Sequence, residues 1–387
     1  MEDDGTDCIQ TPMTYRVALV RGKFLNQYEM QFFEPLVEQF ALTGFASLTP
    51  FHSRYAFPIV QLPSPMDLPE FPYKMPILNR LFTDAQYLFG LEDRLRGFDI
   101  VHTAETYFHY TQQCLNARKK GYVKKVVATV LENIPFNNEG ITGRKVFKLR
   151  AREELDHIIA LTQKTKETLL LEGTDPRKIT IISHFVDTDR FKPIKRQMKS
   201  KEITILFSGR LEKYKGVYEI LFAAKKLLMD KDLKSIPLRF IFVGDGSEKS
   251  HVLALEQRLG IESFVIHQHV SYNEMPKVYN EADIFLAPSK ATETWQEQYN
   301  TTLLEAQASG LPIVTTASGG IAENIGNAGI LVQPADFVSL AEAIKKFILN
   351  SKLRSEYSRR ARKRAETVHD AKIGANKLAQ LYNSLLS

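Results

Sequence analysis

Residues 293–312 read ETWQEQYNTTLLEAQASGLP. The pattern predicts a helix that begins near residue 300 and ends at Gly310. Glu297 precedes this helix, and Glu305 lies on its first or second turn. A helix start binds phosphate through free backbone N–H groups, and carboxylates accept hydrogen bonds from sugar and ribose hydroxyls. The stretch therefore predicts a ligand site with a carboxylate on either side of a helix start.

The same helix start also has a purely structural interpretation. Thr302 and Glu305 have the spacing of a capping box, in which Glu305 only hydrogen-bonds back to its own chain. That interpretation leaves Glu297 and Trp295, the single tryptophan of the sequence, without a role.

Upstream, the apolar run Ile203–Ser208 predicts a buried strand. It leads into the loop Gly209–Gly216 and then into an amphipathic helix. Arg210 and Lys215 thus fall at a strand end and a helix start. Two cations beside the positive end of a helix dipole suit a diphosphate. A basic surface turn would give the same local pattern.

A glycine-containing loop, Val243-Gly244-Asp245-Gly246, follows another apolar run. Two glycines after a strand let the backbone approach a ligand closely, so Gly244 and Asp245 are candidate ligand-binding residues. The motif is short, and a tight turn explains it equally well.

Apolar runs alternate with helical stretches along the whole chain, which predicts an α/β protein with parallel sheets. The first series of expected strands comprises Arg16–Val20, Ile100–Thr103, Val126–Val130, Ile158–Leu161 and Ile179–Ile182. The second series comprises Ile203–Ser208, Arg239–Val243, Ile284–Ala287, Ile313–Thr316 and Ile330–Val332. Two doubly wound domains in tandem would place a cleft between the carboxyl ends of their sheets, so functional residues are expected in loops directly after strands.

Two segments do not fit this alternation of strands and helices. Residues 192–202 are polar and lysine-rich and are predicted to link the two domains. Residues 58–76 contain six prolines and are predicted to form a long surface loop.

Length and composition indicate a globular protein of more than one domain. The chain has 387 residues, of which 44% are hydrophobic and 25% charged. No apolar run approaches the roughly 20 residues of a membrane-spanning helix. The acidic N-terminus is unlike a secretory signal, and two cysteines, Cys8 and Cys114, exclude a disulfide framework and a cysteine-built zinc site. We therefore expect a cytoplasmic protein.

The formal net charge is 51 − 45 = +6, which is modest for this length. No nucleic-acid-binding module is recognisable, so we expect no nucleic-acid partner. Basic residues cluster at 118–125, 144–152 and 352–364. They fit solvated helix faces, or a docking surface for anionic lipids that would hold the protein on the inner face of a membrane.

Taken together, these motifs resemble the retaining glycosyltransferases of group 1 (family 4), which have the GT-B fold of two Rossmann-like domains. The resemblance rests on Glu297 and Glu305 with seven residues between them, on Gly310 and Pro312, and on the loop Gly209–Gly216. Further segments that resemble the family are Leu155–Thr162, Ile179–Phe191, Tyr279–Ser289 and Gly319–Glu323. The resemblance extends over nearly the whole chain.

The resemblance implies that different parts of the chain bind the acceptor and the nucleotide sugar. Residues 1–192 would form the acceptor-side domain, residues 193–369 the nucleotide-sugar-binding domain, and residues 370–387 a C-terminal helix that crosses back to the first domain. In the donor site, Arg210 and Lys215 would neutralise the diphosphate, Glu305 would hold the ribose hydroxyls, and Glu297 would face the sugar. Other implied donor-site residues are Gly209, Gly244, Asp245, Asn300, Thr301, Thr302 and Leu303.

Such enzymes keep the anomeric configuration and use no metal or other cofactor, because the cations neutralise the leaving group. His102, His109 and His184 are accordingly expected to be structural rather than metal ligands.

Three positions depart from the family pattern. Tyr214 stands where members often have glutamate, and the acceptor loop is reduced to Arg21-Gly22-Lys23, so that Gly22 and Lys23 are the acceptor-side candidates. The loop after Val126–Val130 lacks the histidine that contacts the donor sugar in most members. Glu132, together with Glu105, is the candidate catalytic replacement. Alternatively, Glu132 pairs with a basic residue of the neighbouring segment.

The expected reaction moves a hexosyl group from a nucleoside diphosphate sugar to a hydroxyl of a glycan or lipid-linked acceptor, with retention. Departure and attack on one face of the sugar need no protein nucleophile, and the enzyme mainly positions its substrates, neutralises charge and closes its domains. A sugar-nucleotide epimerase and a non-catalytic nucleotide-sugar-binding protein are the alternatives. A nicotinamide dehydrogenase is disfavoured because no Gly-x-Gly-x-x-Gly follows the first strand. The base, the sugar and the acceptor stay open.

Overall fold

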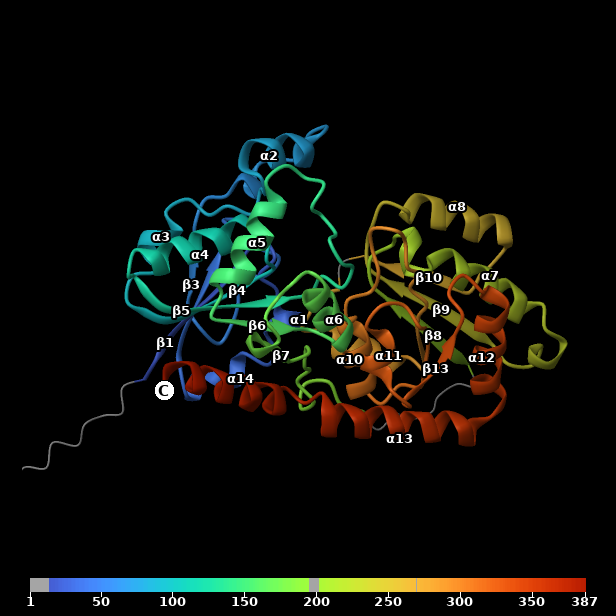
Figure 1. The fold of residues 1–387 in the computed structure, drawn as a ribbon. Coiled ribbons are helices and arrows are strands. Elements are labelled where there is room, and N and C mark those ends of the chain that lie inside the picture. Colours follow the sequence, from blue (N-terminus) through green and yellow to red (C-terminus); the bar gives the residue numbers. More distant parts are fainter. Residues whose placement is uncertain (1–13, 195–201, 269) are drawn as a thin grey trace, which may run out of the picture.

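The computed structural model describes residues 14–194, 202–268 and 270–387, and its strands form two parallel sheets (Figure 1). The first sheet has seven strands in the order β3-β2-β1-β4-β5-β6-β7. These strands are β1 (Arg16–Gly22), β2 (Ala41–Ala46), β3 (Ile59–Gln61), β4 (Phe98–Ala104), β5 (Val123–Val130), β6 (His157–Ala160) and β7 (Ile179–Ile181). Each neighbouring pair is parallel.

Helices connect these strands. The α-helices of this domain are α1 (Gln27–Met30), α2 (Lys74–Phe82), α3 (Leu91–Arg94), α4 (His109–Lys119), α5 (Arg144–Glu154) and α6 (Gln163–Leu171). Three 3-10 helices, η1 (Glu34–Glu38), η2 (Pro65–Asp67) and η3 (Pro176–Lys178), complete it.

The second sheet has six strands in the order β10-β9-β8-β11-β12-β13, again all parallel. Its strands are β8 (Ile203–Ser208), β9 (Leu238–Val243), β10 (Phe264–His267), β11 (Ile284–Ala287), β12 (Ile313–Thr316) and β13 (Gly329–Val332). Its helices are α7 (Val217–Leu228), α8 (Lys249–Leu259), α9 (Met275–Glu281), α10 (Thr301–Ala308), α11 (Ile321–Ile325) and α12 (Phe337–Leu349), with the 3-10 helices η4 (Lys213–Lys215) and η5 (Lys231–Leu233). The predicted class, two parallel α/β domains, is confirmed.

Both faces of the first sheet are buried. Along β1, Val17 and Leu19 belong to one apolar cluster, whereas Ala18 and Val20 belong to another. Successive residues of a strand point to opposite faces, so each face has its own core. This explains why the strands read as continuous apolar runs rather than as alternating patterns.

Each sheet has a point where the strand order reverses. In the first sheet the reversal falls between β1 and β4, and in the second it falls between β8 and β11. Ligands of doubly wound proteins bind outside the carboxyl ends of the strands at this point. The topology therefore directs attention to the loops after Gly22 and Ala104 in the first domain, and after Ser208 and Ala287 in the second.

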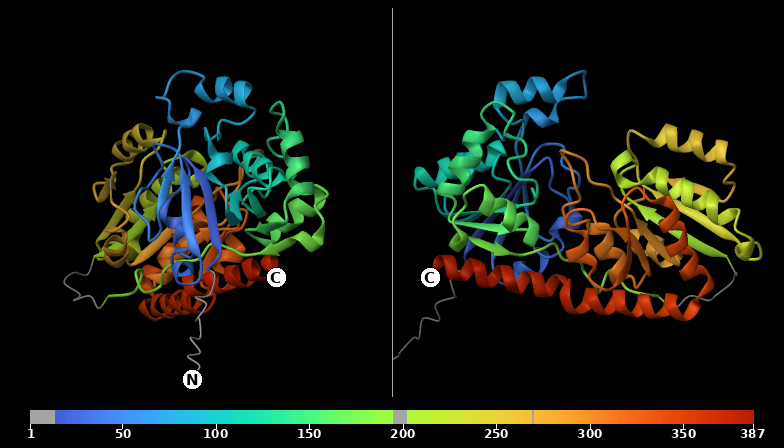
Figure 2. Two further views of the ribbon diagram at one scale, coloured as in Figure 1. Left: turned by 90° about the vertical axis from the view of Figure 1, so that its left-hand side faces the viewer. Right: turned by 45° about the vertical axis from the view of Figure 1, so that its right-hand side comes forward.

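The chain ends in two long helices, α13 (Ser351–Val368) and α14 (Ala371–Leu386), which run along both domains (Figures 1 and 2). Helix α14, at the place where the resemblance implied a returning helix, packs on the first domain: Leu378 and Tyr382 share an apolar cluster with Val17 and Leu19. The Tyr382 hydroxyl and His102 Nδ1 form a 2.6 Å hydrogen bond. His102 thus has the structural role expected of it.

Three strands escaped the sequence prediction. Strand β2 contains Gly44, and β3 and β10 are half-exposed edge strands of three and four residues, so none gives a long apolar run. The proline-rich segment 58–76 is not a single loop, because β3, η2 and the start of α2 lie within it. Cys8, the acidic N-terminus and most of the predicted linker, residues 195–201, lie outside the described residues.

Candidate active site

The loop after β8 is built on close backbone contacts with the loop after β9. A Cβ atom at Gly244 would lie 2.0 Å from the Gly209 carbonyl oxygen, and one at Gly246 would lie 2.4 Å from that of Leu211. The Leu211 N–H donates to the Asp245 carbonyl over 2.9 Å. The two glycines after β9 therefore have a packing reason, which is that they allow the two loops to touch.

Lys215 and Glu297, predicted from separate motifs, are in direct contact. Lys215 Nζ lies 2.7 Å from Glu297 Oε2, and Ser289 Oγ donates to the same oxygen over 2.8 Å. Ser289 follows β11, so the pair sits where the second sheet reverses its strand order. Gly216 makes the approach possible: its φ is +77°, and a Cβ atom there would lie 2.2 Å from the Pro288 carbonyl oxygen.

Aromatic rings surround the two cations. The Tyr214 and Trp295 ring centroids are 4.1 Å apart, and Lys215 Nζ lies 4.9 Å from the Trp295 ring. The single tryptophan thus covers Lys215. The Arg210 guanidinium lies 5.5 Å from the Tyr214 ring and is exposed. Within the described part of the chain, Arg210 has no ion-pair partner, so its charge is available to a ligand.

The start of α10 presents free backbone donors beside this pair. Asn300 has φ of +62° and starts the helix without a side-chain cap. Among the described residues, the N–H groups of Thr301 and Thr302 have no protein acceptor, whereas the Leu303 N–H donates to the Asn300 carbonyl over 3.1 Å. Asn300 Nδ2 lies 3.4 Å from Glu297 Oε2. Free N–H groups at a helix start attract anions.

Glu305 is buried on this helix and does not reach back to its start. Its two carboxylate oxygens accept hydrogen bonds from the hydroxyls of Tyr272, over 2.9 Å, and Tyr279, over 2.7 Å. The capping-box interpretation is therefore wrong. Burial raises the pKa of Glu305 to about 7, although the two tyrosine hydrogen bonds act in the opposite direction.

Tyr272 connects Glu305 to the first domain. Its ring lies 5.4 Å from that of Tyr28, edge to face, and 6.0 Å from that of His52. The Arg190 guanidinium lies 4.3 Å from its ring centroid. Tyr272 could not be predicted from the sequence, because a lone tyrosine before a short helix carries no motif.

Two loops from the opposite domain meet the Glu297 loop. Asn133 Nδ2 donates to the Glu297 carbonyl over 3.0 Å, and Gln296 Nε2 donates to the Asn133 carbonyl over 3.3 Å. Lys164 Nζ donates to Gln296 Oε1. The loop that lacks the family histidine thus lies against the loop that carries Glu297.

Glu132 is held by its own loop rather than by a cation. Its Oε1 accepts from the backbone of Asn133 and Ile134, each over 3.0 Å, and its Oε2 accepts from the side chains of Asn137 and Asn138. The expected pairing with a basic residue is therefore wrong. The four donors satisfy the carboxylate and fix the shape of residues 132–138.

Glu105 holds the same loop through hydrogen bonds to its backbone. It has φ of +57°, which is strained for a non-glycine residue. Its Oε1 accepts from the backbone of Leu131, over 2.9 Å, and of Glu132, over 3.1 Å. Burial, followed by the charge of Glu132, raises the pKa of Glu105 to about 8.

The acceptor-side candidates lie at the reversal point of the first sheet. Gly22 ends β1 with φ of +54°, and a Cβ atom there would lie 3.2 Å from Gln86 Oε1 and 3.3 Å from the Tyr110 ring. Lys23 Nζ donates to Thr49 Oγ1 over 2.6 Å. Gln86 Oε1 and the Tyr110 hydroxyl are buried without partners in the described structure. Neither residue was predicted, since neither belongs to a recognisable motif.

The basic cluster at 144–152 is not a free cationic face. Arg144 and Lys148 are buried and pair with Asp84 and Glu172, each over 2.5 Å. Arg152 is also buried against Glu172, over 2.9 Å. Arg144 and Lys148 therefore fit neither a solvated helix face nor a lipid-binding surface, because both charges are neutralised inside the domain.

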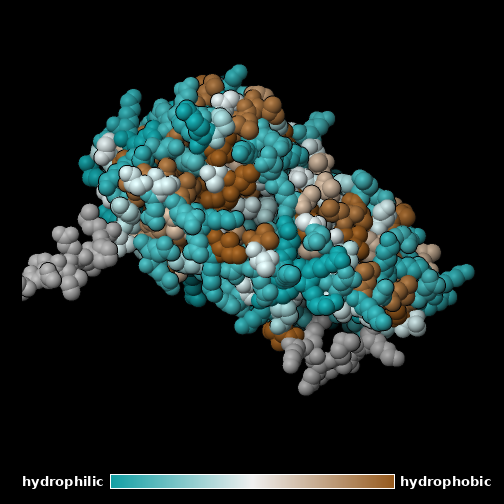
Figure 3. Space-filling view, turned by 60° about the horizontal axis from the view of Figure 1, so that its bottom comes forward, coloured by the Kyte–Doolittle hydropathy of each residue, from teal (hydrophilic) through white to brown (hydrophobic). Residues whose placement is uncertain are grey.

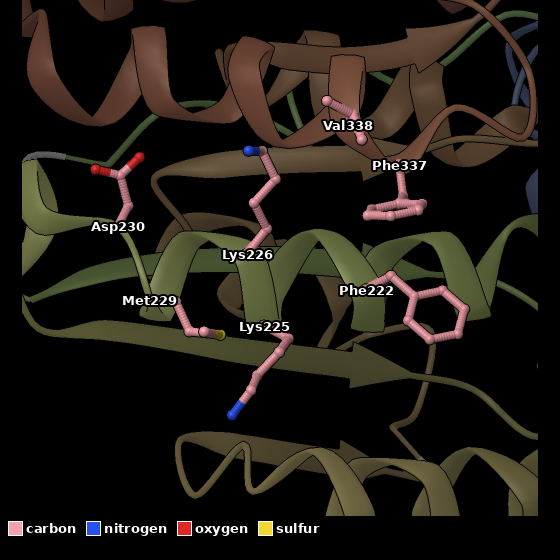
Figure 4. Close-up of a pocket in the computed structure, with 7 residues that line it drawn as sticks. All are labelled: Phe222, Lys225, Lys226, Met229, Asp230, Phe337 and Val338. Atoms are coloured by element: carbon pink, nitrogen blue, oxygen red, sulfur yellow. The ribbon is translucent and has the colours of Figure 1, made fainter.

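The described residues contain no group of three or more His, Cys, Asp or Glu side chains arranged to hold a metal ion. In the same residues, no helix has the length and apolar character needed to cross a bilayer. A pocket lies elsewhere, between α7 and α12, where the rings of Phe222 and Phe337 approach each other (Figure 4). None of its lining residues belongs to the loops at the strand ends.

Two family models match consecutive parts of the chain. The model described as Glycosyltransferase Family 4 matches residues 48–190, and the model described as Glycosyl transferases group 1 matches residues 188–364. The Arg210–Gly216 loop, Glu297 and α10 all lie within the second match.

Curated relatives and solved structures agree with these matches. The chain is 26% identical over 269 residues to the capsular polysaccharide biosynthesis glycosyltransferase CapM of Staphylococcus aureus, covering 64% of this chain and 68% of the relative. It is 30% identical over 217 residues to D-inositol 3-phosphate glycosyltransferase 2 of Catenulispora acidiphila. That match covers 51% of this chain and 50% of the relative. The solved structure of Anabaena HepE in complex with UDP and glucose superposes with a TM-score of 0.75 at 16% identity, covering 96% and 100% of the two chains.

Proposed function

Because the chain belongs to the group 1 glycosyltransferases, we propose that it moves a hexosyl group from a nucleoside diphosphate sugar to a hydroxyl of a glycan or lipid-linked acceptor, with retention and without a metal. The observation that carries this proposal is the Lys215–Glu297 contact beside the free start of α10. Arg210 and Lys215 lie in the loop after β8, and Asn300, at the start of α10, lies 3.4 Å from the Glu297 carboxylate that Lys215 contacts.

The charges at this position fit a diphosphate leaving group. Arg210 is available, Lys215 can exchange Glu297 for a phosphate oxygen, and the Thr301 and Thr302 N–H groups add the positive end of α10. Preorganised donors of this kind stabilise charge that develops as the glycosidic bond breaks. Metal independence is proposed on this basis. The UDP and glucose bound to Anabaena HepE support a nucleotide sugar as the donor.

Glu305 is proposed to hold the ribose. Its oxygens already accept two hydroxyl hydrogen bonds, from Tyr272 and Tyr279, which are the kind of bonds that the ribose diol would supply. A ribose hydroxyl must replace the Tyr272 hydroxyl, because the carboxyl group is otherwise buried.

Retention is proposed to follow from attack on the face that the leaving group departs from. The acceptor hydroxyl is itself the nucleophile, so no protein nucleophile is needed, and its proton passes to the departing phosphate. Glu297 faces the sugar. Glu105 and Glu132 act as positioning residues, since Glu105 Oε1 and both carboxylate oxygens of Glu132 accept from backbone and asparagine donors of the 131–138 loop.

Thermal-shift measurement with a panel of nucleoside diphosphates and their sugars tests the donor first. We expect one base to stabilise the protein, and Arg210→Ala to abolish most of that shift. Arg258, an exposed arginine on α8, provides the matched control Arg258→Ala.

Product analysis then separates the alternatives. We expect donor to be consumed only when an acceptor is present. Conversion of donor alone to an isomeric sugar nucleotide would identify an epimerase, and tight binding without turnover across a broad acceptor panel would identify a non-catalytic binding protein.

A further inference from the structure

Two aromatic rings lie side by side next to Lys215. The ring centroids of Tyr214 and Trp295 are 4.1 Å apart, and the ring planes are tilted by 43°. Tyr214 belongs to η4, in the loop after β8, whereas Trp295 belongs to the loop between β11 and α10. The ring pair therefore joins the two loops that flank the reversal point of the second sheet.

Each ring is carried by a backbone that its own surroundings hold. The Lys290 N–H donates to the Tyr214 carbonyl over 2.7 Å, and the Lys290 ammonium group pairs with Glu219 over 2.7 Å. In the other loop, the Thr292 N–H donates to the Trp295 carbonyl over 2.7 Å, and the Trp295 N–H donates to Thr292 Oγ1 over 3.0 Å. Both rings are half-buried. Their contact is thus built by two fixed turns.

The rings cover the ammonium group of Lys215. Its Nζ lies 4.9 Å from the Trp295 ring and 6.0 Å from the Tyr214 ring. The Lys215 side chain is only 15% exposed, although lysine side chains usually lie in water. An aromatic face attracts a cation. The rings therefore hold the charge and also occupy the space that water would take beside it.

Other contacts surround the carboxylate partner of Lys215. Ser289 Oγ lies 2.8 Å and Asn300 Nδ2 lies 3.4 Å from Glu297 Oε2. The Glu297 side chain is 8% exposed. The ion pair is thus enclosed by polar side chains around its carboxylate and by aromatic rings around its ammonium group.

The first domain reaches the same loop on both sides of the tryptophan. Asn137 Nδ2 donates to the Thr294 carbonyl over 3.2 Å, and Asn133 Nδ2 donates to the Glu297 carbonyl over 3.0 Å. Trp295 lies between Thr294 and Glu297 in the chain. The ring pair therefore stands where the two domains meet, which is the side from which the proposed function brings the acceptor.

That function faces a competing reaction, because water is also a hydroxyl nucleophile. A water oxygen at the acceptor position would bond to the anomeric carbon as the bond to the diphosphate breaks, and its proton would pass to the departing phosphate. The products would be free sugar and nucleoside diphosphate. Since no protein nucleophile takes part, transfer is favoured over hydrolysis only if water is kept out.

We propose that Tyr214 and Trp295 form an aromatic cover that excludes water from the bound donor, so that the protein selects an acceptor hydroxyl over water. Tyr214 stands where members of the family often have glutamate. A glutamate there would bring a hydrated carboxylate to Lys215 in place of a ring. The inference rests on the proposed function, whose thermal-shift test involves no turnover.

The test is the release of free sugar from donor in the absence of acceptor. The donor used is the UDP-sugar or GDP-sugar that gives the largest thermal shift. We expect slow hydrolysis by the wild-type chain and a hydrolysis rate at saturating donor that is at least tenfold higher in Trp295→Ala. Trp295→Phe keeps a ring and should restore most of the wild-type behaviour.

Two substitutions of Tyr214 separate its ring from its hydroxyl. Tyr214→Phe should hydrolyse the donor as slowly as the wild type, whereas Tyr214→Glu should hydrolyse it faster. Both variants should keep the donor thermal shift. Loss of a cover raises hydrolysis, whereas general damage to the site would lower hydrolysis and thermal shift together.

Tyr357→Ala provides the matched control. The Tyr357 ring is also half-buried, lies 5.2 Å from the Phe347 ring and has the Arg360 guanidinium group 5.0 Å from its centroid. It belongs to α13, which runs along the side of the molecule that Figure 3 shows as mostly hydrophilic. Removing this ring should leave the hydrolysis rate unchanged.

The proposal is overturned if the wild-type chain hydrolyses donor as fast as Trp295→Ala does, or if Trp295→Ala lowers hydrolysis and thermal shift together. A normal thermal shift in Trp295→Ala without faster hydrolysis rejects the aromatic cover and leaves the proposed function intact. If no donor shifts the melting of the wild-type chain, the proposed function fails, and the cover fails with it.

Discussion

At the scale of single residues, the proposed function depends on Lys215 exchanging the Glu297 carboxylate for a phosphate oxygen. Its ammonium group lies 2.7 Å from Glu297 and beneath the Trp295 ring. An incoming phosphate therefore meets a lysine that is already partly desolvated and held in place by its carboxylate partner. Electrostatic donors that are fixed before the reaction cost little reorganisation in the transition state.

Lys215→Ala should lower kcat/KM by a factor that corresponds to about two to four kcal/mol of transition-state stabilisation, the scale of losing one preorganised electrostatic donor. Steady-state kinetics with the donor identified by thermal shift measure this loss. Lys213→Ala is the control, because Lys213 is two residues away in the same loop but pairs with Glu248 over 3.7 Å. Equal effects of both substitutions would contradict the assigned role of Lys215.

Tyr272 donates a hydrogen bond to Glu305, the carboxylate that is proposed to hold the ribose. Tyr272→Phe removes this competing hydroxyl and keeps the ring that contacts Tyr28. We expect nucleoside diphosphate to bind about fivefold more tightly, which corresponds to one hydrogen bond that no longer has to be exchanged. Isothermal titration measures the dissociation constant, with Tyr357→Phe on α13 as control. Weaker binding in Tyr272→Phe would mean that Tyr272 itself holds the nucleotide.

The raised pKa of Glu305 predicts a pH dependence. With a pKa of about 7, the carboxyl group is mostly protonated at pH 6 and mostly ionised at pH 8. The ionised form is the better acceptor for ribose hydroxyls. Nucleotide affinity should therefore rise with pH by up to about tenfold over this range, following the ionised fraction. The same titration of Glu305→Gln subtracts the ionisation of the nucleotide itself, and identical profiles would reject the assignment.

At the scale of elements, glycines and carboxylates hold the loops that present these residues. Gly319 has φ of +56°, and a Cβ atom there would lie 1.8 Å from the Glu297 carbonyl oxygen. The next residue, Gly320, donates its N–H to that oxygen over 2.9 Å. The Gly319-Gly320 turn therefore positions the Glu297 loop through contact with the Glu297 carbonyl oxygen.

Gly319→Ala should destabilise the protein by at least about 1 kcal/mol more than Gly260→Ala. Gly260 is the matched control, because its φ of +63° imposes the same backbone strain while no atom lies within 4 Å of its added Cβ. Urea denaturation gives both values. If the two glycines tolerate alanine equally, the packing of this turn against Glu297 is not what the contacts indicate.

Glu132→Gln should lower turnover at least tenfold and leave nucleotide affinity nearly unchanged. Glutamine has one acceptor oxygen, whereas Glu132 accepts four hydrogen bonds on two oxygens, so the 132–138 loop loses its shape. Kinetics and titration together measure this separation, and Glu153→Gln on the exposed side of α5 is the control. Unaltered turnover would remove Glu132 from the mechanism.

The sequence predicted the strands and helices better than the contacts between their side chains. Long buried strands such as β5 and β8 give continuous apolar runs, whereas β3 and β10 are too short and too exposed to do so. The helix that begins near Asn300 was predictable, because Gly310 marks its other end. The Tyr272–Glu305 bond was not, since it joins residues 33 positions apart that only the folded sheet brings together. The ion pairs that bury Arg144 and Lys148 were invisible for the same reason.

At the scale of the whole molecule, the two domains meet through the loops at their strand ends. Asn133 of the first domain donates to the Glu297 carbonyl, and Tyr28 packs on Tyr272. The backbone N–H of Gln163 donates to Glu323 Oε2 over 2.8 Å. The loop that carries Glu297 and the Tyr272 ring are therefore contacted by residues of the first domain.

The central claim is that Arg210, Lys215 and the start of α10 share one diphosphate, with Glu305 on the ribose. A crystal structure of the chain with its nucleoside diphosphate tests this most directly. We predict phosphate oxygens within hydrogen-bonding distance of both cations and of the Thr301 or Thr302 N–H, with Lys215 released from Glu297 and a ribose hydroxyl on Glu305. A nucleotide bound elsewhere, with the Lys215–Glu297 pair still closed, would contradict the account.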